Sequence, residues 1–131
     1  MAIINIRKEP KTKVNEDSLK KALRKYLKEN NVGDKAEMTV ALVGETTMRG
    51  LGEKYLDETD GKLHNVLSFT VGDVDKNFVS PPGQTRKLGE VVVCYPVALD
   101  EAKKEGISTQ EKIQSLAMHG ILHLLGIHHA H

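Results

Sequence analysis

The sequence predicts a single domain that combines α-helices with β-strands, and three observations lead to this fold class. The chain has 131 residues, the size of one domain, with 39% hydrophobic and 28% charged residues. Segments with the two-residue alternation of strands and segments with the periodicity of helices both occur along it. No internal repeat, low-complexity tract or linker divides it. We therefore expect one domain spanning residues 1–131.

The first two predicted elements are a short strand and an amphipathic helix. Residues 3–7 alternate weakly between apolar and polar, which is typical of a strand. A helix is predicted to begin at Asn15, a favoured N-cap residue, and to end at Gly33. Its apolar residues recur at the spacing of one buried stripe: Leu19, Ala22, Leu23, Tyr26 and Leu27.

The opposite side of this helix carries a stripe of basic residues. Such a stripe can contact RNA phosphates, but a charged helix face is more often only solvated. The net charge of +1 means that no field of the whole molecule attracts nucleic acid, so a basic RNA-binding surface has to be local. The candidate RNA-binding residues are Lys20, Lys21, Arg24, Lys25 and Lys28.

The middle of the chain is predicted to form a strand, a helix and a second strand. Residues 38–43 form an apolar strand pattern that ends at a glycine. Thr46 or Thr47 is expected to cap a helix that runs to Tyr55 and is broken by the acidic, glycine-containing run after it. Residues 65–70 then predict the next strand.

A long loop and a buried strand follow. Residues 71–86 have mixed polarity and a Pro-Pro-Gly turn signal, and we interpret this loop as a flap near a functional site. Residues 88–94 predict a strand that is buried on both faces. This strand contains Cys94, the single cysteine, which has no partner for an internal disulfide and is most simply a core residue.

Two helices complete the chain. Pro96 opens the first of them, which is expected to stop at Gly106. Ser108 and Glu111 form a capping box for the last helix. Its predicted apolar stripe is Ile113, Leu116, Ala117, Ile121 and Leu124. No signal peptide and no apolar run long enough for a membrane span is present, and we expect a cytoplasmic protein that does not contact membranes.

The last helix and the tail carry five of the six histidines. Three of them, His119, His123 and His129, follow the spacing His-x-x-x-His-x-x-Gly-x-x-His. Residues i and i+4 lie on one face of a helix, and Gly126 can adopt the left-handed conformation that turns the chain back for a third ligand. Three neutral imidazoles that leave a fourth position to water are typical of a catalytic zinc site. We therefore predict one Zn²⁺ per chain, although cobalt or nickel would also suit imidazole ligands.

The residue after the first histidine departs from the zinc-protease motif. That motif has a glutamate there as general base, and this chain has Gly120. The predicted site therefore has the metal ligands of a protease without its proton acceptor. Ser68, Glu90 and His128 are the candidate proton-transfer residues.

The tract His-Gly-x-Leu-His-Leu-x-Gly-x-x-His resembles the signature of YbeY-type proteins, which are zinc-dependent endoribonucleases of ribosomal RNA maturation. Three further segments, at residues 51–55, 66–69 and 88–91, resemble the other motifs of this family in the same order. The resemblance implies an α+β domain with a mixed sheet of about four strands covered by helices, the metal helix lying across it. It also implies that Ser68 lies near the metal.

Three places differ from the family pattern. Where the family has Thr-Asp before its Val-Leu-Ser-Phe, this chain has His64-Asn65, with about two residues inserted before it. Family members usually have a functional arginine after the tyrosine that matches Tyr55, where this chain has Leu56. Arg49 or Arg86 could replace it only if the fold brings one of them to the site. The family's acid before the third histidine is replaced by His128.

Three functions are consistent with these residues. The first is a single-strand-specific zinc endoribonuclease that acts in ribosomal RNA maturation and ribosome quality control, with ribosomal RNA or a ribosomal subunit as its partner. The second is a noncatalytic zinc-binding module associated with the ribosome. The third is a metallopeptidase, which the missing glutamate makes less favourable.

Overall fold

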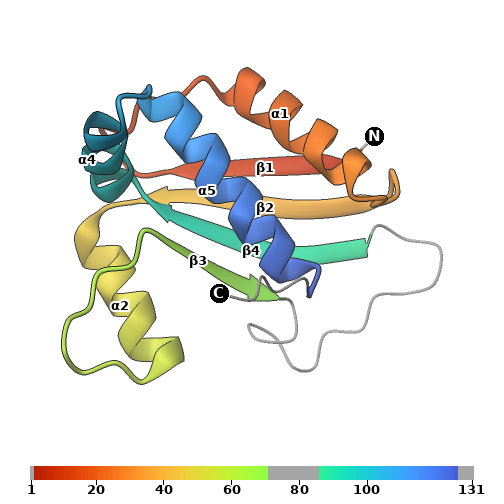
Figure 1. Ribbon diagram of the computed structural model, residues 1–131. Helices are drawn as coiled ribbons and strands as arrows, with labels where there is room; N and C mark the ends of the chain where they lie inside the picture. Colours follow the sequence, from red (N-terminus) through yellow and green to blue (C-terminus); the bar gives the residue numbers. More distant parts are fainter. Residues whose placement is uncertain (1, 71–85, 127–131) are drawn as a thin grey trace.

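The computed structural model describes residues 2–70 and 86–126, which form one α+β domain (Figure 1). This confirms the predicted fold class of a mixed four-stranded sheet covered by helices. The strands are β1 (Ile3–Lys8), β2 (Ala36–Val43), β3 (Val66–Thr70) and β4 (Arg86–Cys94). The helices are α1 (Glu16–Glu29), α2 (Glu45–Leu56), α4 (Tyr95–Glu105) and α5 (Thr109–Leu124). Within the described ranges, no helix is both long and apolar enough to cross a membrane.

The sheet has the order β1-β2-β4-β3. Strands β1, β2 and β4 are parallel, and β3 pairs antiparallel with β4 at one edge. The second half of β4, residues 91–94, is buried on both faces, as its continuous apolar run predicts. Because β3 lies at the edge, the residues just before it and along it can border a cavity beside the sheet.

The two faces of the sheet are covered by different helices (Figure 1). Helices α1 and α5 pack on one face over the larger core cluster, which includes Leu23, Val91 and Ile121. Helix α2 lies by the other face, over a smaller cluster that includes Met48 and Phe69. A functional group on one face is therefore separated from the other face by the sheet itself.

The N-terminus of α1 agrees with the sequence prediction, but its C-terminus does not. The Asn15 side chain accepts a hydrogen bond from the Ser18 N–H at 2.9 Å, as an N-cap does. The helix ends at Glu29, before Gly33, because Asn31 adopts a left-handed conformation with φ of 62°. Asparagine is one of the few non-glycine residues that tolerate this conformation.

The cap of α2 comes from a distant residue, so the prediction of a Thr46 or Thr47 cap is wrong. The N-cap is Gly44, which has no side chain for this purpose. The Glu9 carboxylate instead accepts from the Gly44 N–H at 3.0 Å and from the Thr47 hydroxyl at 2.6 Å. Its negative charge also lies at the positive end of the helix dipole.

The thiol of Cys94 provides a probe of the fold because it is fully buried at the end of β4. Burial raises the pKa of this thiol above its usual value. The thiolate therefore forms more readily in the unfolded chain, and this group lowers the free energy of unfolding as the pH rises above about 8.5. We expect a thiol reagent to modify Cys94 at the rate of unfolding, and a Cys94→Ala variant to lose part of the alkaline destabilisation. Modification within seconds under native conditions would contradict the buried position.

Candidate metal centre

The position of the histidines depends on how α5 begins and which face it buries. The Ser108 hydroxyl accepts from the Glu111 N–H at 3.1 Å, which confirms Ser108 as the N-cap, and the Glu111 carboxylate accepts from the Ser108 hydroxyl at 3.2 Å. All five residues of the predicted apolar stripe are buried against the sheet and the neighbouring helices. This fixes the rotation of α5 about its axis, so His119 and His123 lie together on an exposed part of the helix surface.

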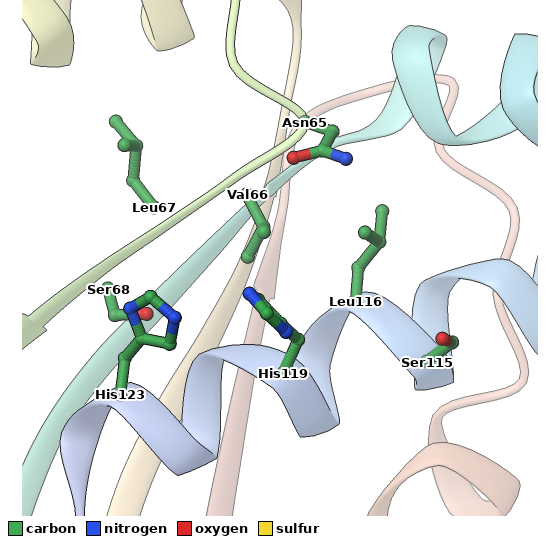
Figure 2. A pocket seen from close by; sticks show the side chains of 8 residues that line it. All are labelled: Asn65, Val66, Leu67, Ser68, Ser115, Leu116, His119 and His123. Carbon is green, nitrogen blue, oxygen red and sulfur yellow. The ribbon is translucent and has the colours of Figure 1, made fainter. Parts of the chain in front are cut away.

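His119 and His123 lie side by side and border a cavity. Their ring centroids are 4.7 Å apart, with an angle of 49° between the ring planes. The cavity has a volume of about 440 Å³ and lies between α5 and the β3 edge of the sheet. Figure 2 shows both imidazoles extending from α5 toward β3. The cavity is lined by Asn65, Val66, Leu67 and Ser68 on the β3 side and by Ser115, Leu116, His119 and His123 on α5.

Gly120 allows α5 to lie directly on the sheet at this point. A Cβ atom at Gly120 would be 2.5 Å from a Val91 methyl carbon and 3.2 Å from the Ser68 Oγ. Atoms at the first of these distances overlap, so no side chain fits at this position without movement of the helix or the strand. The position that holds the general base of zinc proteases therefore faces the sheet in this chain and has no room for a glutamate.

Ser68 lies beside the histidines, as the family resemblance implies. Its hydroxyl donates a hydrogen bond to the Gly120 carbonyl at 3.2 Å, which links β3 to α5. Since the hydroxyl hydrogen is used in this bond, Ser68 can offer a ligand in the cavity only its remaining lone pairs. This geometry suits a residue that holds the two walls of the cavity together better than a proton donor.

Glu90 lies on the opposite face of the sheet from the two histidines. In the antiparallel pairing of β3 and β4 it is the partner of Phe69, which belongs to the core cluster on the α2 side. Directly paired residues point to the same face. On that face Glu90 forms an ion pair with Arg7. The structure therefore does not bring this candidate proton acceptor to the histidines.

The two candidate arginines are not among the residues that line the cavity. Arg49 lies on α2, where it pairs with Glu45 at 3.3 Å and donates to the Gly61 carbonyl at 3.2 Å. Arg86 is the exposed first residue of β4, and its N–H donates to the Lys35 carbonyl at 2.6 Å. Neither described position supplies a replacement for the arginine that the family usually has at Leu56.

The basic stripe of α1 is turned away from α5. Tyr26 of α1 borders a cavity together with Met118 and Leu122 of α5, which marks the side of α1 that faces α5. On the other side, the Arg24 guanidinium donates to the Ala2 carbonyl at 2.9 Å. At 100° per residue, the four lysines lie on the outer surface and on this second side. A role of Lys20, Lys21, Arg24, Lys25 and Lys28 in RNA binding stays a prediction.

The third predicted ligand, His129, lies outside the described residues, as do His128 and residues 71–85 of the flap predicted at 71–86. Helix α5 ends at Leu124, and Gly126 has a φ of 78°, the left-handed conformation that the motif predicts for it. Residues 2–70 and 86–126 contain no group of three or more potential metal ligands. They do supply two imidazoles one helical turn apart beside a cavity, a donor pair that suits zinc.

Two polar residues of the cavity wall were not predicted as site residues from the sequence. Ser115 lies one turn before His119 on the same face of α5, so the four-residue spacing could have indicated it. Asn65 comes from a different part of the chain, and only the pairing of β3 with β4 brings it to the cavity. The signal that could have found it is its position directly before residues 66–69, the segment whose family resemblance implies a place near the metal.

Comparisons with known proteins identify the family. The family model described as Endoribonuclease YbeY matches residues 3–131. A protein from Beutenbergia cavernae named Endoribonuclease YbeY is 37% identical over 110 residues, which cover 83% of this chain and 72% of that protein. A protein of the same name from Clavibacter michiganensis subsp. michiganensis is 35% identical over 127 residues, covering 97% and 82% of the two chains.

A solved structure shares the fold. The solution structure of TM1509 from Thermotoga maritima aligns with a TM-score of 0.60 and 22% identity, covering 98% of this chain and 75% of that one. The family model matches nearly the whole chain, including all four segments on which the sequence resemblance was based. This chain therefore belongs to the YbeY family of endoribonucleases.

Proposed function

We propose that this protein is a zinc-dependent endoribonuclease that cleaves single-stranded RNA in ribosomal RNA maturation and ribosome quality control. The observation that supports this most directly is the pair His119 and His123, adjacent on α5 beside a cavity, in a chain of a family named for endoribonuclease activity. Ribosomal RNA or a ribosomal subunit is the proposed partner, and the cytoplasm is the proposed location.

The proposed ligands of one zinc ion are His119, His123 and His129. The first two come from one face of α5, and the turn at Gly126 begins the path of the chain toward the third. Zinc bound there would supply a positive charge that activates water and polarises a phosphoryl oxygen. The chain itself contributes the cavity, in which β3 and α5 can hold a nucleotide next to the two imidazoles.

A metallopeptidase is a weaker alternative because of the packing around Gly120. Peptide hydrolysis at such a zinc site uses the glutamate that follows the first histidine. The described walls of the cavity contain no aspartate or glutamate, and Gly120 faces Val91 at too short a distance for one to be introduced.

One observation favours the other alternative, a noncatalytic zinc-binding module: the family arginine is replaced by Leu56, which is exposed at the end of α2.

The proposal is tested by metal analysis and cleavage assays on untagged protein. We expect about one zinc ion per chain. We also expect cleavage of a labelled single-stranded RNA at neutral pH, with an RNA duplex left intact. A chelator should abolish cleavage and added zinc should restore it. Metal binding without cleavage would select the noncatalytic module, and cleavage of casein with RNA left intact would select the metallopeptidase. Protein without metal would contradict all three.

A further inference from the structure

Asn65 stands directly before β3 and lines the same cavity as His119 and His123. Its side-chain amide nitrogen donates to the two carboxylate oxygens of Glu101 on α4, at 3.3 and 3.5 Å. Glu101 in turn pairs with Lys112 of α5 at 3.4 Å, and Lys112 also binds Glu105 at 2.7 Å. The position of the Asn65 amide is therefore set by three elements: the start of β3, helix α4 and helix α5.

The chemistry of Glu101 fixes which way the amide faces. An ionised carboxylate only accepts hydrogen bonds, so the group that faces it has to be the NH₂ of Asn65 and not its carbonyl oxygen. The Lys112 side chain is only 13% exposed and holds Glu101 from the other side. The hydrogen bond from Lys112 to Glu105 raises the lysine pKa, so this residue keeps its charge.

The carbonyl oxygen of Asn65 is consequently left on the other side of the amide. In Figure 2 this oxygen is turned to the side of Val66, and the nitrogen is turned the opposite way. Within the described ranges the oxygen has no hydrogen-bond partner. No side-chain nitrogen or oxygen of the described residues is both buried and unpaired, so this atom is accessible to a ligand.

We propose that the Asn65 carbonyl oxygen accepts a hydrogen bond from the nucleotide bound in the cavity, and that Glu101 and Lys112 position it for this purpose. This inference rests on the proposed function as an endoribonuclease. Phosphates offer only acceptors, whereas the ribose 2′-hydroxyl and the N–H groups of the bases are donors. An oriented acceptor in the same cavity as His119 and His123 therefore binds the sugar or base beside the phosphate, not the phosphate itself.

The first arm of the test compares Asn65→Ala, Glu101→Ala and Glu101→Gln with the unmodified protein. Affinity for a fluorescein-labelled oligouridine RNA is measured by fluorescence anisotropy in the presence of a chelator. Loss of one hydrogen bond of about 1 kcal/mol corresponds to about fivefold weaker binding, which we expect for Asn65→Ala. Glu101→Ala releases the amide and should weaken binding severalfold. Glu101→Gln can present either its oxygen or its NH₂ to Asn65, so it keeps the contact without fixing the orientation and should weaken binding less than Glu101→Ala does.

The glutamine variant separates positioning from a merely structural role. If Glu101 only stabilised the contact of α4 with α5 through its charge, Glu101→Gln would be as defective as Glu101→Ala, and thermal unfolding would show equal losses of stability. Binding by Asn65→Ala that equals binding by the unmodified protein would overturn the proposal. If the unmodified protein neither binds nor cleaves RNA, the proposed function fails as well. That outcome is distinguished from failure of the Asn65 proposal alone, in which the unmodified protein still binds RNA.

The second arm identifies the donor. The same oligouridine is prepared in the 2′-deoxy form, and the loss caused by Asn65→Ala is measured on both ligands. A loss that disappears on the deoxy ligand assigns the 2′-hydroxyl as the donor, because protein and ligand changes then remove the same hydrogen bond. A loss that persists on the deoxy ligand assigns an N–H group of the base. An equal affinity of all proteins for both ligands would contradict both assignments.

Discussion

Replacement of either His119 or His123 by alanine is expected to remove both the bound metal and RNA cleavage, while leaving the fold intact. Each histidine supplies one of three proposed ligands, and a site reduced to two protein ligands does not retain zinc at ordinary concentrations. Both side chains are exposed on α5, so their removal should change the free energy of unfolding by no more than about 0.5 kcal/mol. Metal content, cleavage of single-stranded RNA and thermal unfolding are measured on the same preparations.

His64 provides the matched control for this experiment. Its imidazole is half-buried and binds the Glu58 carboxylate at 2.7 Å, and it is not among the residues that line the cavity. We expect His64→Ala to lower stability but to retain metal and cleavage. If His119→Ala or His123→Ala bound metal as the unmodified protein does, the zinc site would have to be built from other residues, and the proposed ligand set would be rejected.

The features of α5 were predictable because they depend on residues close together in the sequence. The four-residue spacing of His119 and His123 places them on one face of any helix, and the N-cap at Ser108 fixes where the helix begins. The apolar stripe then determines which face is buried. These three local rules were sufficient to predict how α5 presents His119 and His123.

The features that depend on tertiary contacts were not predictable in the same way. Alternation along β4 places Glu90 and Val92 on one face of the sheet and Val91 on the other. The sequence does not indicate which of the two faces α5 covers. The Glu9 cap of α2 and the Asn65 contact with Glu101 join residues 35 and 36 positions apart. Such contacts follow from the order of strands in the sheet, which is set by the packing of the whole domain.

The second large effect is expected at Gly120, where side chains should be excluded. An added Cβ overlaps a Val91 methyl group at 2.5 Å, and overpacking of this kind costs about 1–3 kcal/mol. Alanine in place of a helical glycine returns about 1 kcal/mol. We therefore expect Gly120→Ala to lower the free energy of unfolding by up to about 2 kcal/mol, and to weaken metal binding as α5 moves away from β3. Gly120→Glu, which recreates the protease motif, should be far more destabilised and should not gain peptidase activity, since burial of an unpaired carboxylate adds a further cost.

Gly50 on α2 separates this steric effect from the general consequence of replacing glycine in a helix. It is exposed, and a Cβ built there meets no atom within 4 Å. Gly50→Ala should therefore raise the free energy of unfolding by about 0.4–1 kcal/mol, the opposite sign from Gly120→Ala. The glutamate can be missing because there is no space for it or because the chemistry does not use it. Chemical denaturation of both variants decides between these two explanations. If Gly120→Ala were as stable as Gly50→Ala, α5 could accept a side chain against β4, and the glycine would then reflect a chemistry that does not use a carboxylate base instead of a lack of space.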